Sequence, residues 1–387
     1  MTESRGLVTC SPIEGRPVPV LLLGLSAGPG GTGLQMLGMA KSLDRSQFEP
    51  HICVFRDSWN TREEIAALKL PILHLPVHSF KSWSVVSYAR QLFSYLKRHR
   101  IVLTHCWDYS TSTFCFPVAK AAGVNVILIS QRAHRALTPQ PYRNISRILD
   151  RLVDGIVVNS QFMMNHMIYD EKAPPSRIYQ CLNGIELDRF CAAPGPRPPI
   201  LQDAKVVVGV VCMLRPEKNI QLLMRAFSKI QRSDLLVKLI IVGSGPEQTS
   251  LLQLRAALGL DESRCAFEPA TKNVRYWLRG IDVFVLPSRS EASANSLIEA
   301  MACGCCVVAS ATGGNLEVIE HFQTGLLFRS DDVDSLVAEL KTAVQDEQLR
   351  KRLGENASRF TRDRFSWETS ARNMGEIYSK LLRHGGQ

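Results

Sequence analysis

The stretch VFVLPSRSEASANSLIEAMACGCCVVAS, residues 283–310, decides the fold, because it contains a strand, a helix and a second strand in succession. The apolar run VFVLPS is typical of a buried strand, and CCVVAS has the same character. Between them the pattern predicts a helix from Asn295 to Ala302, which Gly304 ends. Such a unit is typical of a parallel sheet covered by helices.

The same alternation runs through both halves of the chain and predicts an α/β protein with two Rossmann-like domains. The expected strands are VPVLLLGL, HICVF, VLTHCW, NVILIS and GIVVNS, then VVVGVVCML, VKLIIVGSG, VFVLPS, CCVVAS and TGLLF. Proline and glycine mark residues 191–205 as a linker. We therefore expect one domain in 1–190, a second in 206–365, and a helix in 366–387 that packs back on the first. Ligands of two such sheets are expected in a cleft beyond the carboxyl ends of the strands.

The composition is that of a globular protein, with 387 residues, 45% hydrophobic and 21% charged. No apolar run is long enough to span a membrane. The eleven cysteines are an odd number without His partners at zinc spacing, which favours reduced thiols and a cytoplasmic location over disulfides or a metal site. The net charge of +10 is concentrated in residues 81–151, where eleven Lys or Arg accompany two Asp. This bias predicts an anionic partner such as a membrane surface, and the absence of nucleic-acid-binding motifs argues against nucleic acid.

Glycines follow the first expected strand in GLSAGPGGTG, residues 24–33. Gly28, Gly30 and Gly33 have GxGxxG spacing, in which the backbone and a helix, here expected from Leu34, approach a phosphate. This spacing alone is compatible with a dinucleotide site, a sugar-nucleotide site or a tight turn.

Two further strand ends have residues suited to a nucleotide. Gly243 and Gly245 follow one strand, where glycine lets the backbone turn sharply and lie close to a ligand. In MLRPEKN, Arg215 and Lys218 stand just ahead of an amphipathic helix. Fixed cations there can neutralise a departing diphosphate.

The two glutamates of the opening stretch differ in position, since Glu291 falls in the loop and Glu299 one turn inside the helix. On one continuous helix they would be roughly 12 Å apart, too far for the carboxylate pair of a retaining hydrolase. Two separate contacts to sugar hydroxyls suit this spacing better. The pair Asp332 and Asp334 resembles a metal-binding DxD, but its place at a helix start favours capping.

The second half resembles the retaining family 4 (group 1) glycosyltransferases of GT-B fold. The resemblance rests on MLRPEKN, IIVGSGPE, DVFVLPSRSE, NSLIEAMACGCCVVASATGGNLEVI, TGLLF and RFSW, in that order. GGTG, DGIVVNS and YQCLNGIELDRF extend it into the first half, so that it covers about residues 18–382.

The resemblance implies roles for individual residues. Glu299 would accept hydrogen bonds from the ribose hydroxyls of a sugar nucleotide, Glu291 would hold a hydroxyl of the donor sugar, and Lys218 would contact the diphosphate. The other implied contacts are backbone groups of the N-terminal glycine loop and of the helix start: Gly30, Gly31, Ser293, Ala294, Asn295. The resemblance implies no metal for chemistry.

The sequence departs from the family pattern at three places. Met213 occupies the position of a usual arginine, and Arg215 is the substitute we expect. The EGFG-type turn reads EASA from Glu291, without its usual backbone-turn residues. Where many members have a histidine, the chain reads ISQRAHR, which places Gln131 or Arg132 nearest that position; we assign the polar group near the reacting sugar to His134.

We therefore expect a glycosyltransferase that uses a nucleotide-diphosphate sugar, with a UDP-sugar as the expected donor and a lipid-linked or saccharide acceptor. Cell-surface polysaccharide or glycolipid synthesis at the inner face of a membrane, reached through residues 81–151, is the expected setting. The alternatives are a catalytically silent nucleotide-sugar-binding subunit, a sugar-nucleotide epimerase and an NAD-dependent dehydrogenase, for which the acid at Asp57 is misplaced. The sequence leaves open the donor base and sugar, the linkage and the oligomeric state.

Overall fold

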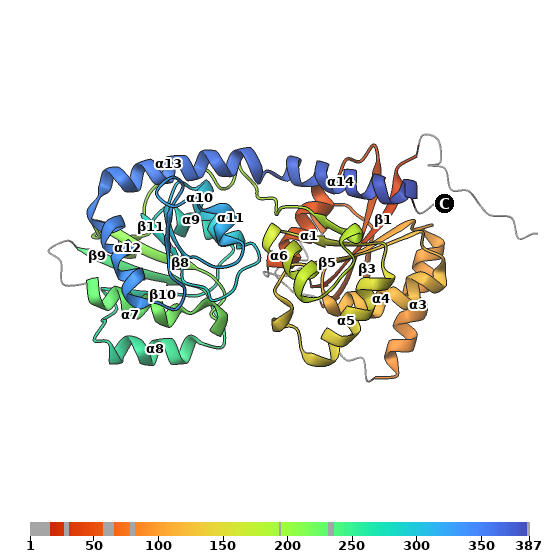
Figure 1. Ribbon diagram of the computed structural model, residues 1–387, viewed down its shortest axis with the longest axis horizontal. Helices are drawn as coiled ribbons and strands as arrows, with labels where there is room; N and C mark the ends of the chain where they lie inside the picture. Colours follow the sequence, from red (N-terminus) through yellow and green to blue (C-terminus); the bar gives the residue numbers. More distant parts are fainter. Residues whose placement is uncertain are drawn as a thin grey trace, which may run out of the picture. The chain divides into compact units, whose positions relative to one another are not determined.

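The computed structural model describes residues 16–26, 31–56, 66–77, 82–192, 195–230 and 236–384. They form two compact units. The N-terminal unit comprises the described residues up to Gly184 together with those from Trp367 onward, and the C-terminal unit is Ile185–Ser366. Each unit is an α/β structure with helices on both faces of a parallel sheet (Figure 1).

The N-terminal unit is built on a seven-stranded parallel sheet of order β3-β2-β1-β4-β5-β6-β7. Its central strands are apolar and buried, which is the pattern of a sheet covered on both faces. The strands are β1 (Val18–Ser26), β2 (Phe48–Arg56), β3 (Ile72–His74), β4 (Leu103–Cys106), β5 (Val126–Gln131), β6 (Gly155–Val158) and β7 (Ile178–Gln180).

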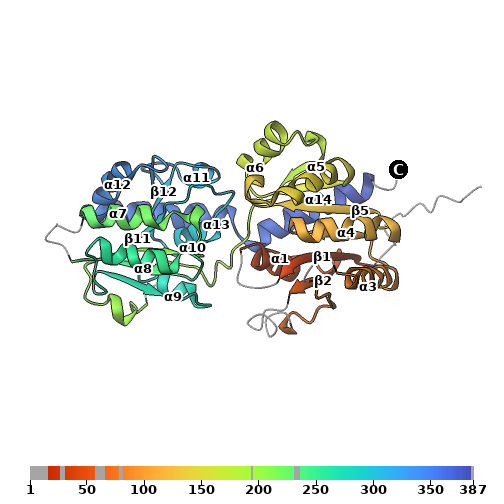
Figure 2. The same ribbon diagram turned by 90° about the horizontal axis from the view of Figure 1, so that it is seen from below.

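Two layers of helices cover this sheet (Figures 1 and 2). On one face α1 (Gly31–Ser42) packs against α14 (Trp367–His384). On the other face α4 (Tyr109–Ala122) lies between α3 (Ser84–Arg98) and α5 (Gln140–Leu152). The short α6 (Gln161–Asn165) follows β6 and continues into a π-helical turn, His166–Asp170.

Trp367 joins α14 to the rest of the N-terminal unit. Its indole lies against two glycines, and a Cβ added at Gly38 would come within 1.9 Å of the ring and one at Gly184 within 2.3 Å. Farther along α14, the fully buried Tyr378 hydroxyl pairs with His105 Nδ1 at 2.8 Å. The terminal helix is therefore part of the core of this unit.

The C-terminal unit contains a six-stranded parallel sheet of order β10-β9-β8-β11-β12-β13. Its strands are β8 (Val206–Val211), β9 (Val237–Val242), β10 (Cys265–Glu268), β11 (Val283–Leu286), β12 (Cys306–Ser310) and β13 (Leu326–Phe328). One face is covered by α7 (Ile220–Ile230), α8 (Gln248–Ala257) and α12 (Val333–Gln345). The other is covered by α9 (Val274–Leu278), α10 (Asn295–Ala302) and α13 (Glu347–Arg364), and the one-turn α11 (Asn315–Val318) follows β12.

All ten predicted strands are confirmed, and so is the helix Asn295–Ala302, after which Gly304 has φ +80°. The prediction that Asp332 caps a helix is also confirmed, since its side chain accepts the Ser335 N–H at the start of α12. The expected start of the first helix at Leu34 is wrong: α1 begins at Gly31, because the helix absorbs the last glycines of the predicted loop.

Three strands were not predicted, namely β3, β7 and β10. Each is only three or four residues long, and each lies at the edge of its sheet. These three edge strands are partly exposed and lack the continuous apolar run from which the other strands were predicted.

No helix of the described residues is long and apolar enough to cross a membrane. Ten cysteines lie in the described part of the chain, all with free thiols. Seven of them are buried: Cys53, Cys106, Cys115, Cys181, Cys265, Cys305, Cys306.

Candidate functional site

The candidate site lies at the carboxyl edge of the six-stranded sheet, where the loops after β8, β9, β11 and β12 meet. The loop after β11 is bonded to the loop after β8, since the Arg289 N–H donates to the Glu217 carbonyl at 2.9 Å. The Arg289 side chain also pairs with Asp331 at 2.8 Å. These bonds hold together loops from neighbouring strands, at the edge where parallel sheets bind ligands.

Lys218 and Glu291, predicted separately, form an ion pair at this edge with 2.5 Å between Nζ and Oε1. Lys218 ends the 3₁₀ turn Pro216–Lys218, and its side chain is 20% exposed, against 9% for Glu291. Burial alone would lower the pKa of Lys218, but the Glu291 carboxylate raises it above its ordinary value. Lys218 is therefore a fixed cation. The second oxygen of Glu291, Oε2, receives no hydrogen bond from the described residues.

Gly243 and Gly245 bring the loop after β9 against the loop after β8. A Cβ at Gly243, where φ is +156°, would lie 1.9 Å from the Cys212 carbonyl oxygen. One at Gly245 would lie 2.3 Å from the Leu214 carbonyl oxygen. The Leu214 N–H in turn donates to the Ser244 carbonyl at 3.1 Å. Close backbone packing thus requires glycine here, and contact of these glycines with a nucleotide stays a prediction.

Two further glycines at this edge were not singled out from the sequence. Gly313 has φ +51°, and a Cβ there would lie 2.0 Å from the Glu291 carbonyl oxygen. A Cβ at Gly314 would lie 1.9 Å from the Ala292 carbonyl oxygen, and the Gly314 N–H donates to Glu291 O at 2.9 Å. The glycine pair after β12 therefore supports the backbone of Glu291. The adjacent glycines in ATGGN were the signal that could have identified it.

Glu299 lies on α10, and its carboxylate receives no hydrogen bond or ion pair from the described residues. Burial raises the pKa of Glu299 to about 8, an effect that Arg189 opposes and Glu186 reinforces. A partly buried carboxyl without a protein partner is available to hydroxyl groups of a ligand. It does not contact Lys218 or Glu291 directly.

The N-terminus of α10 follows Glu291 by three residues. Its N-cap is Ala294, which has no side-chain acceptor for the first N–H groups of the helix. Ser293 and Asn295 flank it and are partly buried. Without a capping side chain, this helix start suits an oxygen atom of a ligand.

Arg215 lies beside this arrangement and not inside it. Its side chain is 53% exposed and 3.8 Å from Glu217, a loose surface contact. Met213, at the position of the usual family arginine, is also exposed, at 39%. Lys218 is therefore the better-fixed cation of the two that were predicted.

The remaining predicted residues belong to the N-terminal unit. Gly31 is the first residue of α1, whereas Gly30 and Asp57 lie outside the described residues. His134 caps a short 3₁₀ turn by accepting the Ala136 N–H at 3.2 Å, and its ring stacks on His166 with centroids 3.9 Å apart. Its role near the donor sugar stays a prediction.

His134, His166 and Asp170 are the one group in the described part of the chain whose ligand atoms lie close enough to hold a metal, within 4.8 Å of one another. Three of their four ring nitrogens already have protein partners: His134 Nδ1 accepts the Ala136 N–H, His166 Nδ1 pairs with Asp170 at 2.8 Å, and His166 Nε2 accepts the Arg135 N–H at 3.4 Å. The stacked rings are therefore accounted for by packing and hydrogen bonding.

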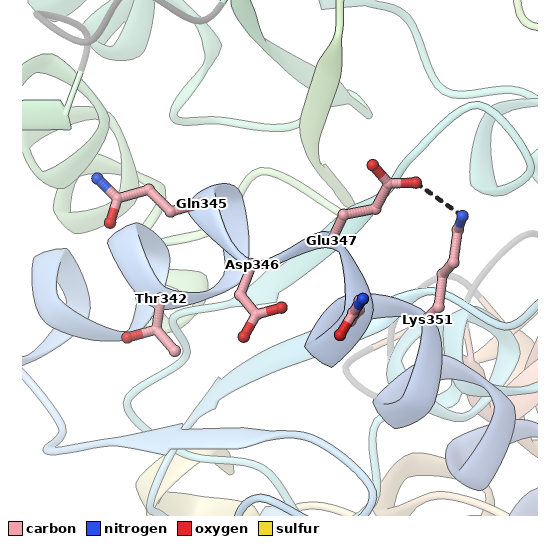
Figure 3. A pocket seen from close by; sticks show the side chains of 6 residues that line it. Thr342, Gln345, Asp346, Glu347 and Lys351 are labelled. Carbon is pink, nitrogen blue, oxygen red and sulfur yellow. Dashed lines mark ion pairs between the residues drawn. The ribbon is translucent and has the colours of Figure 1, made fainter.

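An open hollow of about 660 Å³ lies elsewhere, at the turn between α12 and α13 (Figure 3). Its lining is polar and mostly exposed, and Glu347 and Lys351 form a helical ion pair of 2.7 Å within it. It shares no residue with the carboxyl edge of the sheet, and we assign it no function.

Two family descriptions match the chain. "Glycosyl transferases group 1" matches residues 197–360, and "Glycosyltransferase Family 4" matches residues 29–189. The chain belongs to the group 1 glycosyltransferases of family 4, as the sequence resemblance implied.

Among curated proteins, the N-acetyl-alpha-D-glucosaminyl L-malate synthase of Bacillus anthracis is 32% identical over 184 residues, 48% of each chain. The D-inositol 3-phosphate glycosyltransferase of Salinispora tropica is 28% identical over 248 residues, 59% of this chain and 51% of that one. The chain thus spans about half the length of these relatives.

Among solved structures, HepE of Anabaena in complex with UDP and glucose superposes with a TM-score of 0.82 at 20% identity. The match covers 94% of this chain and all of that one. This likeness confirms the predicted fold, the two-domain α/β fold of GT-B glycosyltransferases.

Proposed function

We propose that the protein is a glycosyltransferase that moves a sugar from a nucleotide-diphosphate sugar to an acceptor hydroxyl with retention of the anomeric configuration. The observation that supports this most directly is the Lys218–Glu291 pair, fixed at the carboxyl edge of the sheet beside the uncapped start of α10. Family membership and a fold shared with a protein that binds UDP and glucose support the same reaction class.

The chemistry requires stabilisation of two developing charges. As the bond to the diphosphate breaks, positive charge grows at the anomeric carbon and negative charge on the leaving oxygen. Lys218, kept protonated by Glu291, would neutralise the leaving diphosphate, with exposed Arg215 as a secondary cation. Glu291 would use its unpartnered oxygen to hold a sugar hydroxyl. We propose no enzyme nucleophile and no metal in this reaction.

Glu299 would bind the ribose of the donor, for which we propose a UDP-sugar. Its carboxylate has no partner among the described residues, so two ribose hydroxyls can donate to it. The backbone at Gly243, Gly245 and Ser293 to Asn295, together with Gly30 and Gly31 of the N-terminal unit, would complete the donor contacts. His134 remains the proposed polar group near the reacting sugar.

We propose a lipid-linked or saccharide acceptor and an anionic membrane surface as partner, in polysaccharide or glycolipid synthesis on the cytoplasmic side. The support comes from what we call the α3–α5 surface, the exposed sides of these two helices together with the residues that flank α3. Its exposed apolar residues are Trp83, Val86, Phe93, Ile145, Ile148 and Leu152. Its exposed basic residues are Arg90, Lys97, Arg98, Arg100, Arg147 and Arg151. Apolar and basic side chains together are typical of surfaces that bind anionic membranes.

A thermal-shift screen with UDP, GDP, ADP and TDP sugars tests the proposed donor site. We expect one of them to raise the melting temperature of the wild type and to have little effect on Glu299→Ala. Glu339→Ala is the matched control, because Glu339 is also a partly buried helical glutamate of the C-terminal unit with a raised pKa. Equal responses of the wild type and Glu299→Ala would refute the ribose role.

Product analysis with the stabilising donor separates the alternatives. Conversion of the donor sugar without an acceptor would indicate an epimerase. Donor binding without transfer or hydrolysis would indicate a silent subunit, and binding of a nicotinamide dinucleotide would indicate a dehydrogenase.

Co-sedimentation with vesicles tests the α3–α5 surface. We expect binding to phosphatidylcholine vesicles only when phosphatidylglycerol is added, weakened by salt and by Phe93→Ser or Ile148→Ser. Leu316→Ser, which changes an exposed leucine of the C-terminal unit, is the control. Sedimentation that does not respond to phosphatidylglycerol would remove the membrane proposal.

A further inference from the structure

A second cluster of side chains lies at the carboxyl edge of the seven-stranded sheet, in the N-terminal unit. Arg132 follows β5, Trp107 follows the neighbouring strand β4, and Asn183 follows β7. The Arg132 guanidinium lies over the Trp107 ring, 4.8 Å from its centroid, and donates a hydrogen bond to Asn183 Oδ1. Three loops that are distant in sequence thus fix one cation at the edge where such sheets bind ligands.

Arg132 has no carboxylate partner within 4 Å among the described residues. Arg135, three residues later, provides the contrast: it is buried, and it pairs with Asp150 through 2.5 and 3.0 Å contacts and with Glu171 at 3.4 Å. Burial lowers the pKa of Arg132 to about 10, and the nearby Cys181 thiol opposes this effect. Arg132 remains a cation at neutral pH, and no carboxylate of the described residues compensates its charge.

Hydrogen-bond donors exceed acceptors around this cation. Of the five guanidinium N–H groups, one has an acceptor in the described part of the chain. The Trp107 indole N–H is buried and has none there. His105, stacked on Trp107, is occupied by Tyr378 and Ser130, and burial lowers its pKa to about 3, so it adds no charge.

A partly desolvated guanidinium without a counter-ion is costly, and an anion is the ligand that would offset that cost. The planar fork of arginine suits the paired oxygens of phosphate and carboxylate groups. The donor contacts proposed above are mostly in the C-terminal unit, where Lys218 serves the diphosphate. With the donor diphosphate already paired with Lys218, an anion held by Arg132 would belong to the other substrate.

We propose that Arg132, held by Trp107 and Asn183, binds a phosphate or carboxylate group of the acceptor. This rests on the proposed function, because it assumes that the protein uses an acceptor. The Arg132 site would restrict the acceptor to anionic molecules.

The test is anion binding to the full chain in the absence of donor. Inorganic phosphate and L-malate serve as phosphate and carboxylate probes, and UDP is titrated in parallel. For Arg132→Gln we expect at least about tenfold weaker binding of a probe, which is the usual loss for a charged hydrogen bond. Binding of UDP should be unchanged. Arg132→Lys should bind the probe with an affinity between those of the wild type and Arg132→Gln, because lysine keeps the charge but loses the planar fork of arginine. Arg372→Gln, which removes an exposed arginine of α14 in the same unit, is the matched control.

A second measurement uses the wild type and therefore does not depend on whether the variants fold. Phenylglyoxal modifies arginine, and peptide mass spectrometry locates the adduct. Phosphate or malate should slow modification of Arg132 and leave that of Arg372 unchanged.

Each outcome decides the proposal. Loss of UDP binding in Arg132→Gln to the same extent as probe binding would assign the anion to the donor and overturn it. Equal binding of the probes to the wild type and Arg132→Gln, or no protection of Arg132, would also overturn it. A protein that binds phosphate or malate through Arg132 but no nucleotide sugar would keep this subsite and refute the donor site instead.

Discussion

The carboxyl edges of the two sheets are built in different ways. In the C-terminal unit, glycines let backbone segments touch, and the Lys218–Glu291 pair is formed on that scaffold. In the N-terminal unit, the described part of the edge is formed by side chains, with Arg132 stacked on Trp107 and bonded to Asn183. A backbone scaffold fixes one ligand geometry closely, whereas side chains from separate loops can change independently. The first arrangement suits the proposed donor site, and the second suits a site whose ligand is selected by individual side chains.

The largest expected effect is on the cation of the C-terminal edge. Lys218→Ala should lower the transfer rate by about 10²–10³-fold, the usual loss for a preorganised group that stabilises developing charge. Lys229→Ala is the control, because Lys229 is half exposed in the same unit and pairs with Asp334 on the surface. Steady-state kinetics with the identified donor measure both variants, and a loss below tenfold would remove Lys218 from the leaving-group role.

Substitution of Gly313 tests whether backbone packing fixes the same edge. Gly313→Ala combines a strained φ of +51° with a 2.0 Å approach to the Glu291 carbonyl, so we expect about 3 kcal/mol of destabilisation. Gly259→Ala has a similar φ of +65° but open space around its Cβ, and should lose about 1 kcal/mol. Urea unfolding of both variants gives the difference, and equal losses would show that the contact with Glu291 O is unimportant.

Substitution of Gly38 tests how far side-chain packing determines the stability of the N-terminal unit. Gly38→Ala would place a methyl group 1.9 Å from the Trp367 ring, and we expect about 1–3 kcal/mol of destabilisation from overpacking. Gly375→Ala on α14 meets Phe48 at 3.3 Å, a contact that a shift of a few tenths of an ångström relieves, and the better helix propensity of alanine offsets part of the cost, so it should lose clearly less stability than Gly38→Ala. A larger loss for Gly38→Ala in denaturant unfolding would confirm the tight packing, and a stabilised Gly38→Ala would contradict it.

The smallest effect concerns pH. With a folded pKa of about 8 and a lower unfolded value, Glu299 binds more protons in the folded state, so its contribution to stability is lost as pH rises toward and through 8. Donor binding should show the reverse, because the ionised carboxylate accepts two ribose hydroxyls. We expect UDP affinity to rise up to about tenfold from pH 7 to pH 9 in the wild type.

Glu299→Gln should flatten both dependences. Isothermal titration calorimetry at several pH values measures the affinity, and thermal unfolding over the same range measures the stability. Parallel pH profiles of the wild type and Glu299→Gln would show that another group is responsible.

The central strands could be predicted because each is a continuous apolar run. The strands β3, β7 and β10 could not, because these edge strands are partly exposed and have no such run. Helix α10 was predicted to the residue, since Gly304 ends it and the loop before it is polar. Helix α1 was placed three residues late, because glycine usually indicates a loop and here begins a helix.

The site was predicted where its residues lie in local motifs. Lys218 and Glu291 were each identified, but their contact joins positions 73 residues apart and no sequence pattern encodes it. Arg132 was noted only as a departure from the family pattern. Its partners Trp107 and Asn183 come from other loops, so the cluster became visible only when the strand order brought these loops to one edge.

The seven buried thiols make the protein a reporter of its own unfolding. Cys53, Cys106, Cys115 and Cys181 are in the N-terminal unit, whereas Cys265, Cys305 and Cys306 are in the C-terminal unit. A thiol-alkylating reagent reaches them only when the surrounding structure opens. Mass spectrometry of labelled peptides would therefore give a separate opening free energy for each half of the molecule, without any engineered probe.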